Sequence, residues 1–87
     1  MNNIQKPIKF SEHAKNQLKY RGATEEEVIQ TIRNAAWQPA ELGRLECIHE
    51  FEFNNIWNGK LYKRKEVRPI FVEEDKIVVV TIYVYYS

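Results

Sequence analysis

The dipeptide Asn58-Gly59 constrains the fold of this chain more than any other feature of its sequence. Both residues tolerate the positive φ angles of a type I′ turn, so the dipeptide predicts a two-residue loop between antiparallel strands. Alternating residues from Leu45 to Phe53 and a segment from Lys60 to about Glu73 supply these strands. Glu74-Asp75 predicts a second tight turn, and Ile77 to Tyr86 is dense in β-branched and aromatic residues. The C-terminal half is therefore predicted to be a three-stranded meander.

Capping signals predict two consecutive helices before this meander. Ser11 offers an N-cap to a helix that ends near Arg21, and Gly22 supplies the left-handed residue after it. Residues Thr24 to Glu27 form a capping box for the next helix. The apolar residues of this second helix follow the helical period: Val28, Ile29, Ile32 and Ala36. We therefore expect a helical hairpin over residues 11 to 36.

The remaining segments complete a single α+β domain. A short strand is expected from Ile4 to Phe10, with Pro7 at an edge or early position, and Gln38-Pro39 with Gly43 indicates a loop. The predicted order is βααβββ, an N-terminal strand and two-helix hairpin packed on an antiparallel sheet. Because 87 residues cannot support two independent cores, we expect one domain spanning residues 1–87.

Two-residue loops at both turns would fix the strand register, with Trp57 opposite Lys60. One sheet face then carries polar and aromatic side chains: His49, Phe51, Phe53, Arg64, Glu66, Arg68, Ile70, Val79, Thr81, Tyr83 and Tyr85. The other face is apolar and carries Val67, Phe71, Val78, Val80, Ile82 and Val84. The apolar face is expected to pack against the helices, because each buried side chain contributes about 1.5 to 3 kcal/mol.

The polar face has the chemistry of a surface that holds phosphates and stacks bases. Arg64 and Arg68 on alternating positions can hold adjacent phosphate oxygens, or they can form surface ion pairs with glutamates. His49 beside Arg68 can act as a general acid or base, or it can be a hydrogen-bonded structural histidine. Tyr83 and Tyr85 can stack bases or simply pack within the sheet.

The net charge of +1 conceals a segregated distribution. Residues 1–23 and 57–70 each carry +4, whereas residues 24–56 carry −5. Such blocks permit a local site for a polyanion and equally describe a mixed solvated surface. Cys47 is the single cysteine and Cys47-x-His49 lacks a second ligand pair, so we expect no disulfide, metal or cofactor. No apolar run is long enough to span a bilayer, which favours a cytoplasmic protein without a membrane partner.

Short motifs along the chain resemble the domain-of-unknown-function family DUF4258. The first helix reads Phe10-Ser11-Glu12-His13-Ala14, then Arg21-Gly22, and the second begins Thr24-Glu25-Glu26-Glu27-Val28. His13, Gln17 and Arg21 are spaced by four and follow one side of the first helix. The closing Val79-Val80-Thr81-Ile82-Tyr83 is similar to that family's terminal strand. The family is similar to the RelE/ParE toxin-like superfamily, which also implies a βααβββ fold.

This resemblance implies a ribonuclease toxin that cleaves free or ribosome-bound RNA without a metal and is neutralised by an antitoxin protein. It places His13 or His49 as acid or base, Arg64 and Arg68 as charge stabilisers, and Tyr83 as a donor. The expected RNA contacts are Arg21, Lys63, Lys65 and Tyr85. A second hypothesis is a non-catalytic interaction module, in which the acidic helix and the exposed strand edge from Leu45 to Phe53 bind a protein by strand addition or helix docking. In this hypothesis Arg64 and Arg68 recognise acidic side chains of the partner.

Overall fold

The computed structural model describes residues 6–87, so the expected strand start at Ile4 lies outside the described part. The N-terminal elements are β1 (Ile8–Phe10), α1 (Glu12–Arg21) and α2 (Glu25–Asn34). Two short strands follow, β2 (Gln38–Pro39) and β3 (Leu45–Glu46), joined by the 3-10 turn η1 (Glu41–Gly43). The long strands are β4 (His49–Trp57), β5 (Lys60–Glu73) and β6 (Ile77–Tyr86).

The predicted α+β class is confirmed, but the predicted element order is incomplete. The segment Gln38-Pro39, expected in a loop, pairs with the start of the segment expected as one strand from Leu45 to Phe53. That segment is divided between β3 and β4. The sheet is also mixed rather than purely antiparallel, because β1 pairs with β6 in parallel.

Both helices begin at the predicted caps. The Ser11 hydroxyl accepts from the Ala14 amide, and Gly22 ends α1 with φ 77°. Thr24 and Glu27 form the complete capping box of α2. The second helix ends at Asn34, earlier than predicted, where Trp37 Nε1 donates to the Ile32 carbonyl at 2.8 Å. Ala36 therefore lies beyond the helix and is exposed.

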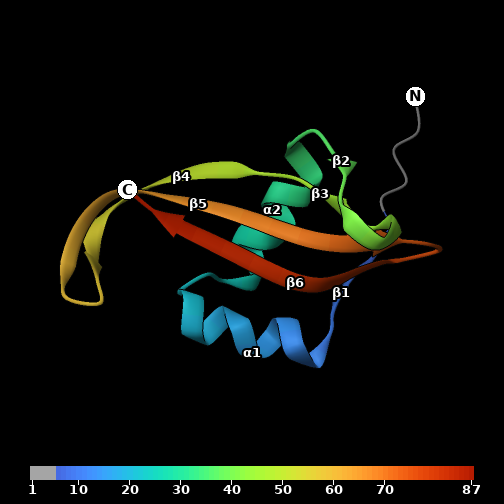
Figure 1. Cartoon of the computed structure of the whole chain (residues 1–87), viewed down its shortest axis with the longest axis horizontal. Helices are drawn as coiled ribbons and strands as arrows, with labels where there is room; N and C mark the ends of the chain where they lie inside the picture. Colours follow the sequence, from blue (N-terminus) through green and yellow to red (C-terminus); the bar gives the residue numbers. More distant parts are fainter. Residues whose placement is uncertain (1–5) are drawn as a thin grey trace.

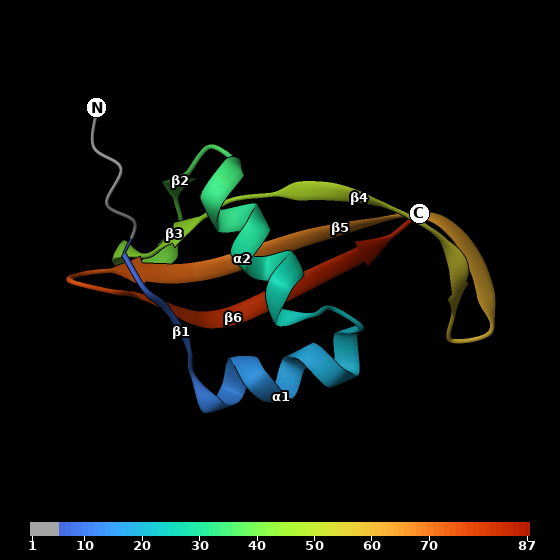
Figure 2. The same ribbon diagram turned by 180° about the vertical axis from the view of Figure 1, so that it is seen from behind.

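The helices leave one face of the sheet open. The strand order is β1-β6-β5-β3-β2, and β4 pairs with β5 beyond β3. Figure 1 shows the sheet in front of α2, and Figure 2 shows α2 crossing the opposite face with α1 alongside β6. The buried core lies between the sheet and these helices and includes Val28, Ile32, Val67, Phe71, Val79 and Ile82.

The predicted register holds at the tip of the β4–β5 hairpin and is wrong beyond it. Trp57 pairs with Lys60, and Asn58 and Gly59 both have positive φ. A bulge between Glu52 and Asn55, with φ 47° at Asn54, then shifts the pairing by one residue. His49 is consequently opposite Val67 instead of Arg68. A one-residue shift exchanges the two faces, so His49 and Phe51 lie on the helix side, and three glutamates face the open side: Glu46, Glu50 and Glu52.

The pairing of β5 with β6 also differs from the prediction, so the predicted faces of β6 are partly wrong. Glu73 pairs with Ile77, so the turn has three residues, and a further shift occurs between Ile70 and Phe71. Ile77 and Val79 therefore enter the core in place of Val78 and Val80. The two shifts together restore the predicted faces at the C-terminal end of β6. Paired residues share a face, so the open side carries Thr81, Tyr83 and Tyr85 as predicted.

Candidate functional site

A groove of about 580 Å³ runs over the open face beside the β2–β3 segment. Its floor comes from the sheet, and one wall comes from Pro39 to Leu42 together with Arg44. The floor residues come from β3, β5 and β6: Glu46, Arg68, Ile70, Thr81, Tyr83 and Tyr85. The groove therefore gathers arginines, glutamates and tyrosines on the sheet face that the helices leave bare.

Arg68 and Glu46 form the most tightly held charged pair of the groove. Arg68 donates from Nε at 3.1 Å and from Nη2 at 2.8 Å to the same carboxylate oxygen of Glu46. This hydrogen bond raises the pKa of Arg68 above its ordinary value. The Glu46 side chain is only 13% exposed, whereas that of Arg68 is 34% exposed. Arg68 is thus fixed in orientation while part of its guanidinium still faces solvent.

Tyr83 and Tyr85 present their rings on the open face, where they are 37% and 49% exposed. Tyr83 is directly opposite Arg68, and the Arg21 guanidinium lies over the Tyr83 ring at 5.3 Å from its centroid. Arg21 reaches the ring from α1, one turn after Gln17. Gln17 Oε1 accepts from the Thr81 hydroxyl at 2.7 Å and from the Ile82 amide at 2.8 Å. These contacts dock α1 along the edge of β6 and bring Arg21 to the groove.

Two further predicted site cations, Arg64 and Lys63, lie outside the groove. Arg64 is opposite Glu52, and its Nε is 3.9 Å from Glu50 with 62% of the side chain exposed. Exposed pairs at this distance contribute about 0 to 1 kcal/mol, so Arg64 remains available to a ligand. Lys63 is exposed, and its backbone amide donates to the Ser87 carbonyl at 2.9 Å.

The predicted cluster of His49 with Arg68 and Tyr83 does not form. The bulge in β4 turns His49 to the helix side, where its ring packs edge-on against Phe51 at 4.6 Å between centroids. His13 is exposed on α1, one turn before Gln17 on the same side of the helix. Of the two histidines, His13 is the one on the helix side that carries Gln17 and Arg21.

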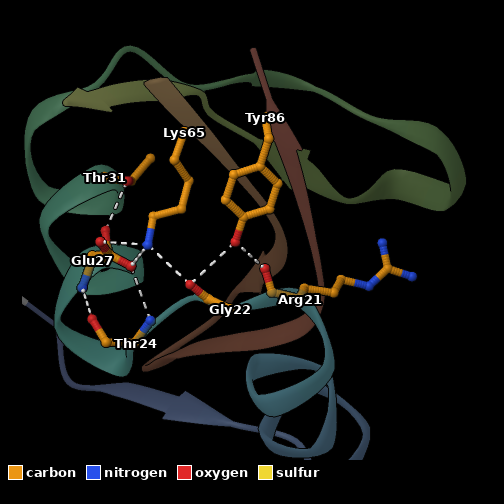
Figure 3. A network of polar contacts seen from close by, with 7 residues as sticks. All are labelled: Arg21, Gly22, Thr24, Glu27, Thr31, Lys65 and Tyr86. Atoms are coloured by element: carbon orange, nitrogen blue, oxygen red, sulfur yellow. Dashed lines mark hydrogen bonds and ion pairs between the residues drawn. The ribbon is translucent and has the colours of Figure 1, made fainter. Parts of the chain in front are cut away.

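Lys65 was predicted to bind RNA, but its side chain is buried beneath the sheet. Its ammonium lies 2.9 Å from the Glu27 carboxylate and donates to the Gly22 carbonyl at 2.9 Å (Figure 3). The Tyr86 hydroxyl donates to the Arg21 carbonyl at 2.7 Å, and its pKa is raised by burial and by the nearby Glu27 charge. Lys65 and Tyr86 thus fasten the helical hairpin to the sheet, and Lys65 does not face the groove.

The groove wall from Pro39 to Leu42, with Arg44, and the floor residue Glu46 were not predicted as site residues from the sequence. The sequence indicates a loop from Gln38-Pro39 to Gly43 and gives no functional role to Leu42, Arg44 or Glu46. Leu42 has φ 61° and is 84% exposed at the groove wall. A leucine in the left-handed region is strained, and such strain recurs at functional sites. A leucine directly before Gly43 in the expected loop was the available signal.

Within residues 6–87, no three His, Cys, Asp or Glu side chains lie close enough together to hold a metal ion. The helices described for this range are also too short and too polar to cross a membrane. Comparison of the chain with protein-family models, curated proteins and solved structures gave no match.

Proposed function

We propose that the open-face groove binds single-stranded RNA and that the protein is a RelE-like endoribonuclease toxin. In this proposal it acts on cytoplasmic RNA, free or ribosome-bound, without a metal ion, and an antitoxin protein neutralises it. One observation carries the proposal: Arg68 lies directly opposite Tyr83, with Tyr85 two residues further along the same strand. Arg21 adds a second guanidinium against the Tyr83 ring.

This arrangement supplies the two contacts that single-stranded RNA requires. Exposed aromatic rings on a bare sheet face stack unpaired bases, each stacked base contributing about 1 to 3 kcal/mol. Arginine guanidiniums hold phosphate oxygens through planar, charge-assisted hydrogen bonds. Arg68 donates to Glu46 from two of its nitrogens, so its other N–H groups can donate to a phosphate. Arg44 and Arg68 match the two glutamates that line the groove, Glu41 and Glu46, and Arg21 adds a cation beside the Tyr83 ring.

The proposed reaction is an internal transfer at phosphorus. The 2′-hydroxyl oxygen attacks the adjacent phosphorus while a base removes its proton. The bond from phosphorus to the 5′-oxygen then breaks, and that oxygen takes a proton from an acid. The products are a 2′,3′-cyclic phosphate and a free 5′-hydroxyl. Arg68, with Arg64 at the edge of the site, stabilises the charge that develops on the phosphate oxygens.

Tyr83 is the polar group of the groove that can take part in the proton transfers. Tyr83 carries a hydroxyl opposite Arg68 and serves as the proton donor. His13, the other predicted acid or base, lies eight residues before Arg21 on α1, about 12 Å along the helix axis from the residue that contacts Tyr83, so solvent takes the 2′-hydroxyl proton in this proposal. His49 lies on the helix face and has no part in this proposal.

The test is cleavage of a fluorescent single-stranded RNA in the presence of EDTA, and in a translation extract. We expect cyclic-phosphate ends, and no cleavage where the 2′-hydroxyl at the scissile position is replaced by hydrogen. Arg68→Ala is expected to lower the cleavage rate by about 10²-fold, because it removes a fixed cation from the transition state. Tyr83→Phe keeps the ring, so it should lower cleavage while RNA binding persists.

Lys76→Ala is the matched control, because Lys76 is an exposed cation in the turn before β6. This variant should cleave like the parent protein, and circular dichroism should show that all variants are folded. The proposal fails if the parent protein neither binds nor cleaves RNA in buffer or on ribosomes. It also fails if Arg68→Ala and Lys76→Ala lower the cleavage rate by the same factor.

A further inference from the structure

The outer edge of β4 is the longest strand edge that the described chain leaves unpaired. Within residues 6–87, β4 pairs with β5 on one side and with no strand on the other. The outer edge of β3 is covered by β2, and α1 covers β6 where Gln17 accepts from the Ile82 amide. Unpaired backbone N–H and C=O groups on such an edge are a template for another strand. The regular stretch before the bulge, His49 to Glu52, is long enough to pair with a short added strand.

A second groove lies directly beside this edge, on the helix side of the sheet. It measures about 590 Å³ and is lined by Thr24, Glu26, Glu27, Ile29, Gln30 and Phe51. Phe51 comes from β4 itself and the other lining residues come from the start of α2, which crosses the sheet there (Figure 2). A strand added to β4 would extend the sheet over α2, and its helix-facing side chains would enter this groove. One added strand would therefore pair with the bare edge and fill the groove with its side chains.

The side chains around this edge indicate which kind of strand could bind there. Phe51 and Ile29 offer apolar contacts on the helix side, beside the exposed Glu26. On the open side, Glu50 is 56% exposed and Glu52 is also exposed. Residues 24–56 together carry a charge of −5. Arg68, expected to recognise an acidic partner, lies away from this edge in the open-face groove. The exposed 3.9 Å pair of Arg64 with Glu50 is weak enough to leave Glu50 available to an incoming cation.

We propose that the β4 edge binds an extended basic segment of a partner protein, which adds as a further strand. Its lysines or arginines meet Glu50 and Glu52 on the open side, and its alternate apolar side chains fill the groove beside Ile29 and Phe51. Backbone hydrogen bonds supply affinity, and the alternation of side chains supplies specificity. The proposal does not rest on RNA cleavage, because the open-face groove is formed by β3, β5, β6 and the wall from Pro39 to Leu42 with Arg44, and shares no lining residue with the second groove. Arg64, which pairs with Glu50, lies between the two sites.

The test uses a fluorescein-labelled seven-residue peptide in which lysine and valine alternate, and a matched peptide with glutamate in place of lysine. Fluorescence anisotropy should show that the lysine peptide binds and that the glutamate peptide does not. Glu50→Lys/Glu52→Lys should weaken binding by about tenfold or more, because two attractive charge pairs become repulsive. Glu12→Lys/Glu74→Lys changes the net charge equally, at exposed sites away from β4, and should bind within about twofold of the parent.

Amide chemical shifts of the parent protein locate the peptide. The proposal requires changes along His49 to Glu52 and at the start of α2. It is overturned if the lysine peptide does not bind, if both double variants lose the same affinity, or if the shifts fall on Tyr83 and Tyr85. It is also overturned if the chain without peptide forms a dimer through β4, because a second copy would then be the occupant. RNA cleavage measured on the same samples reports on the open-face groove separately.

Discussion

At the residue scale, Cys47 shows how burial changes the chemistry of one side chain. It is fully buried, and its thiol donates to the Thr31 carbonyl at 3.6 Å. Burial, assisted by the nearby Glu46 charge, raises its pKa from 9.0 to about 12. A raised pKa in the folded state contributes stability that is complete below the unfolded value and is lost as pH rises through the folded value. This loss therefore falls between pH 9 and about 12.

Cys47→Ala is accordingly expected to flatten the alkaline part of the stability curve. The titration of one such group contributes up to about 1.4 kcal/mol of unfolding free energy per pH unit. Urea unfolding at about pH 8, 10 and 11 should show a shallower decline for the variant, although its cavity lowers stability at every pH. Part of the decline should persist, because the pKa of Tyr86 is also raised. Parallel curves for the two proteins would contradict the assignment to Cys47.

At the element scale, the bulge in β4 decides which residues reach each face of the sheet. It depends on Asn54, whose φ of 47° is reached readily by asparagine and glycine and poorly by β-branched residues. Asn54→Gly is therefore expected to keep the stability within about 0.5 kcal/mol, whereas Asn54→Val should lower it by about 1 to 2 kcal/mol. Thermal unfolding measures both. Equal stability of the two variants would show that the bulge does not require the left-handed conformation.

The same bulge marks the limit of what the sequence could predict. Caps and turns are local, so Ser11, Thr24 and Asn58-Gly59 predicted helix starts and the hairpin tip correctly. A bulge has no comparable local signal, and the pair Asn54-Asn55 within an alternating segment gave only a weak one. One inserted residue moved His49 away from Arg68 and brought Glu46 to it. Arg68, Tyr83 and Tyr85 nevertheless lie on the predicted face. The three-residue turn and the register shift between Ile70 and Phe71 cancel in their effect on side-chain direction.

At the scale of the whole molecule, three distant parts of the chain meet at one end of the sheet. Trp57, next to the hairpin turn, stacks on Tyr86 of the last strand with ring centroids 5.2 Å apart. Tyr86 in turn donates to the Arg21 carbonyl at the end of α1. Gly22 completes the junction, because a Cβ atom there would lie 2.7 Å from Trp57 Cζ3. The hairpin, the link between the helices and the C-terminal strand are thus coupled through a single aromatic cluster.

This coupling predicts that Trp57→Ala loosens more than the hairpin that contains it. Trp57 is half-buried, so the expected loss of unfolding free energy is about 2 kcal/mol, below the 3 to 5 kcal/mol of a fully buried aromatic. Native-state hydrogen exchange should become faster at the end of α1 and in the link to α2, as well as at the hairpin tip. Ile56→Ala, on a neighbouring residue that is 63% exposed, should change stability by less than about 0.5 kcal/mol. Faster exchange confined to β4 and β5 would show that the helical hairpin is held to the sheet without Trp57, through its other contacts.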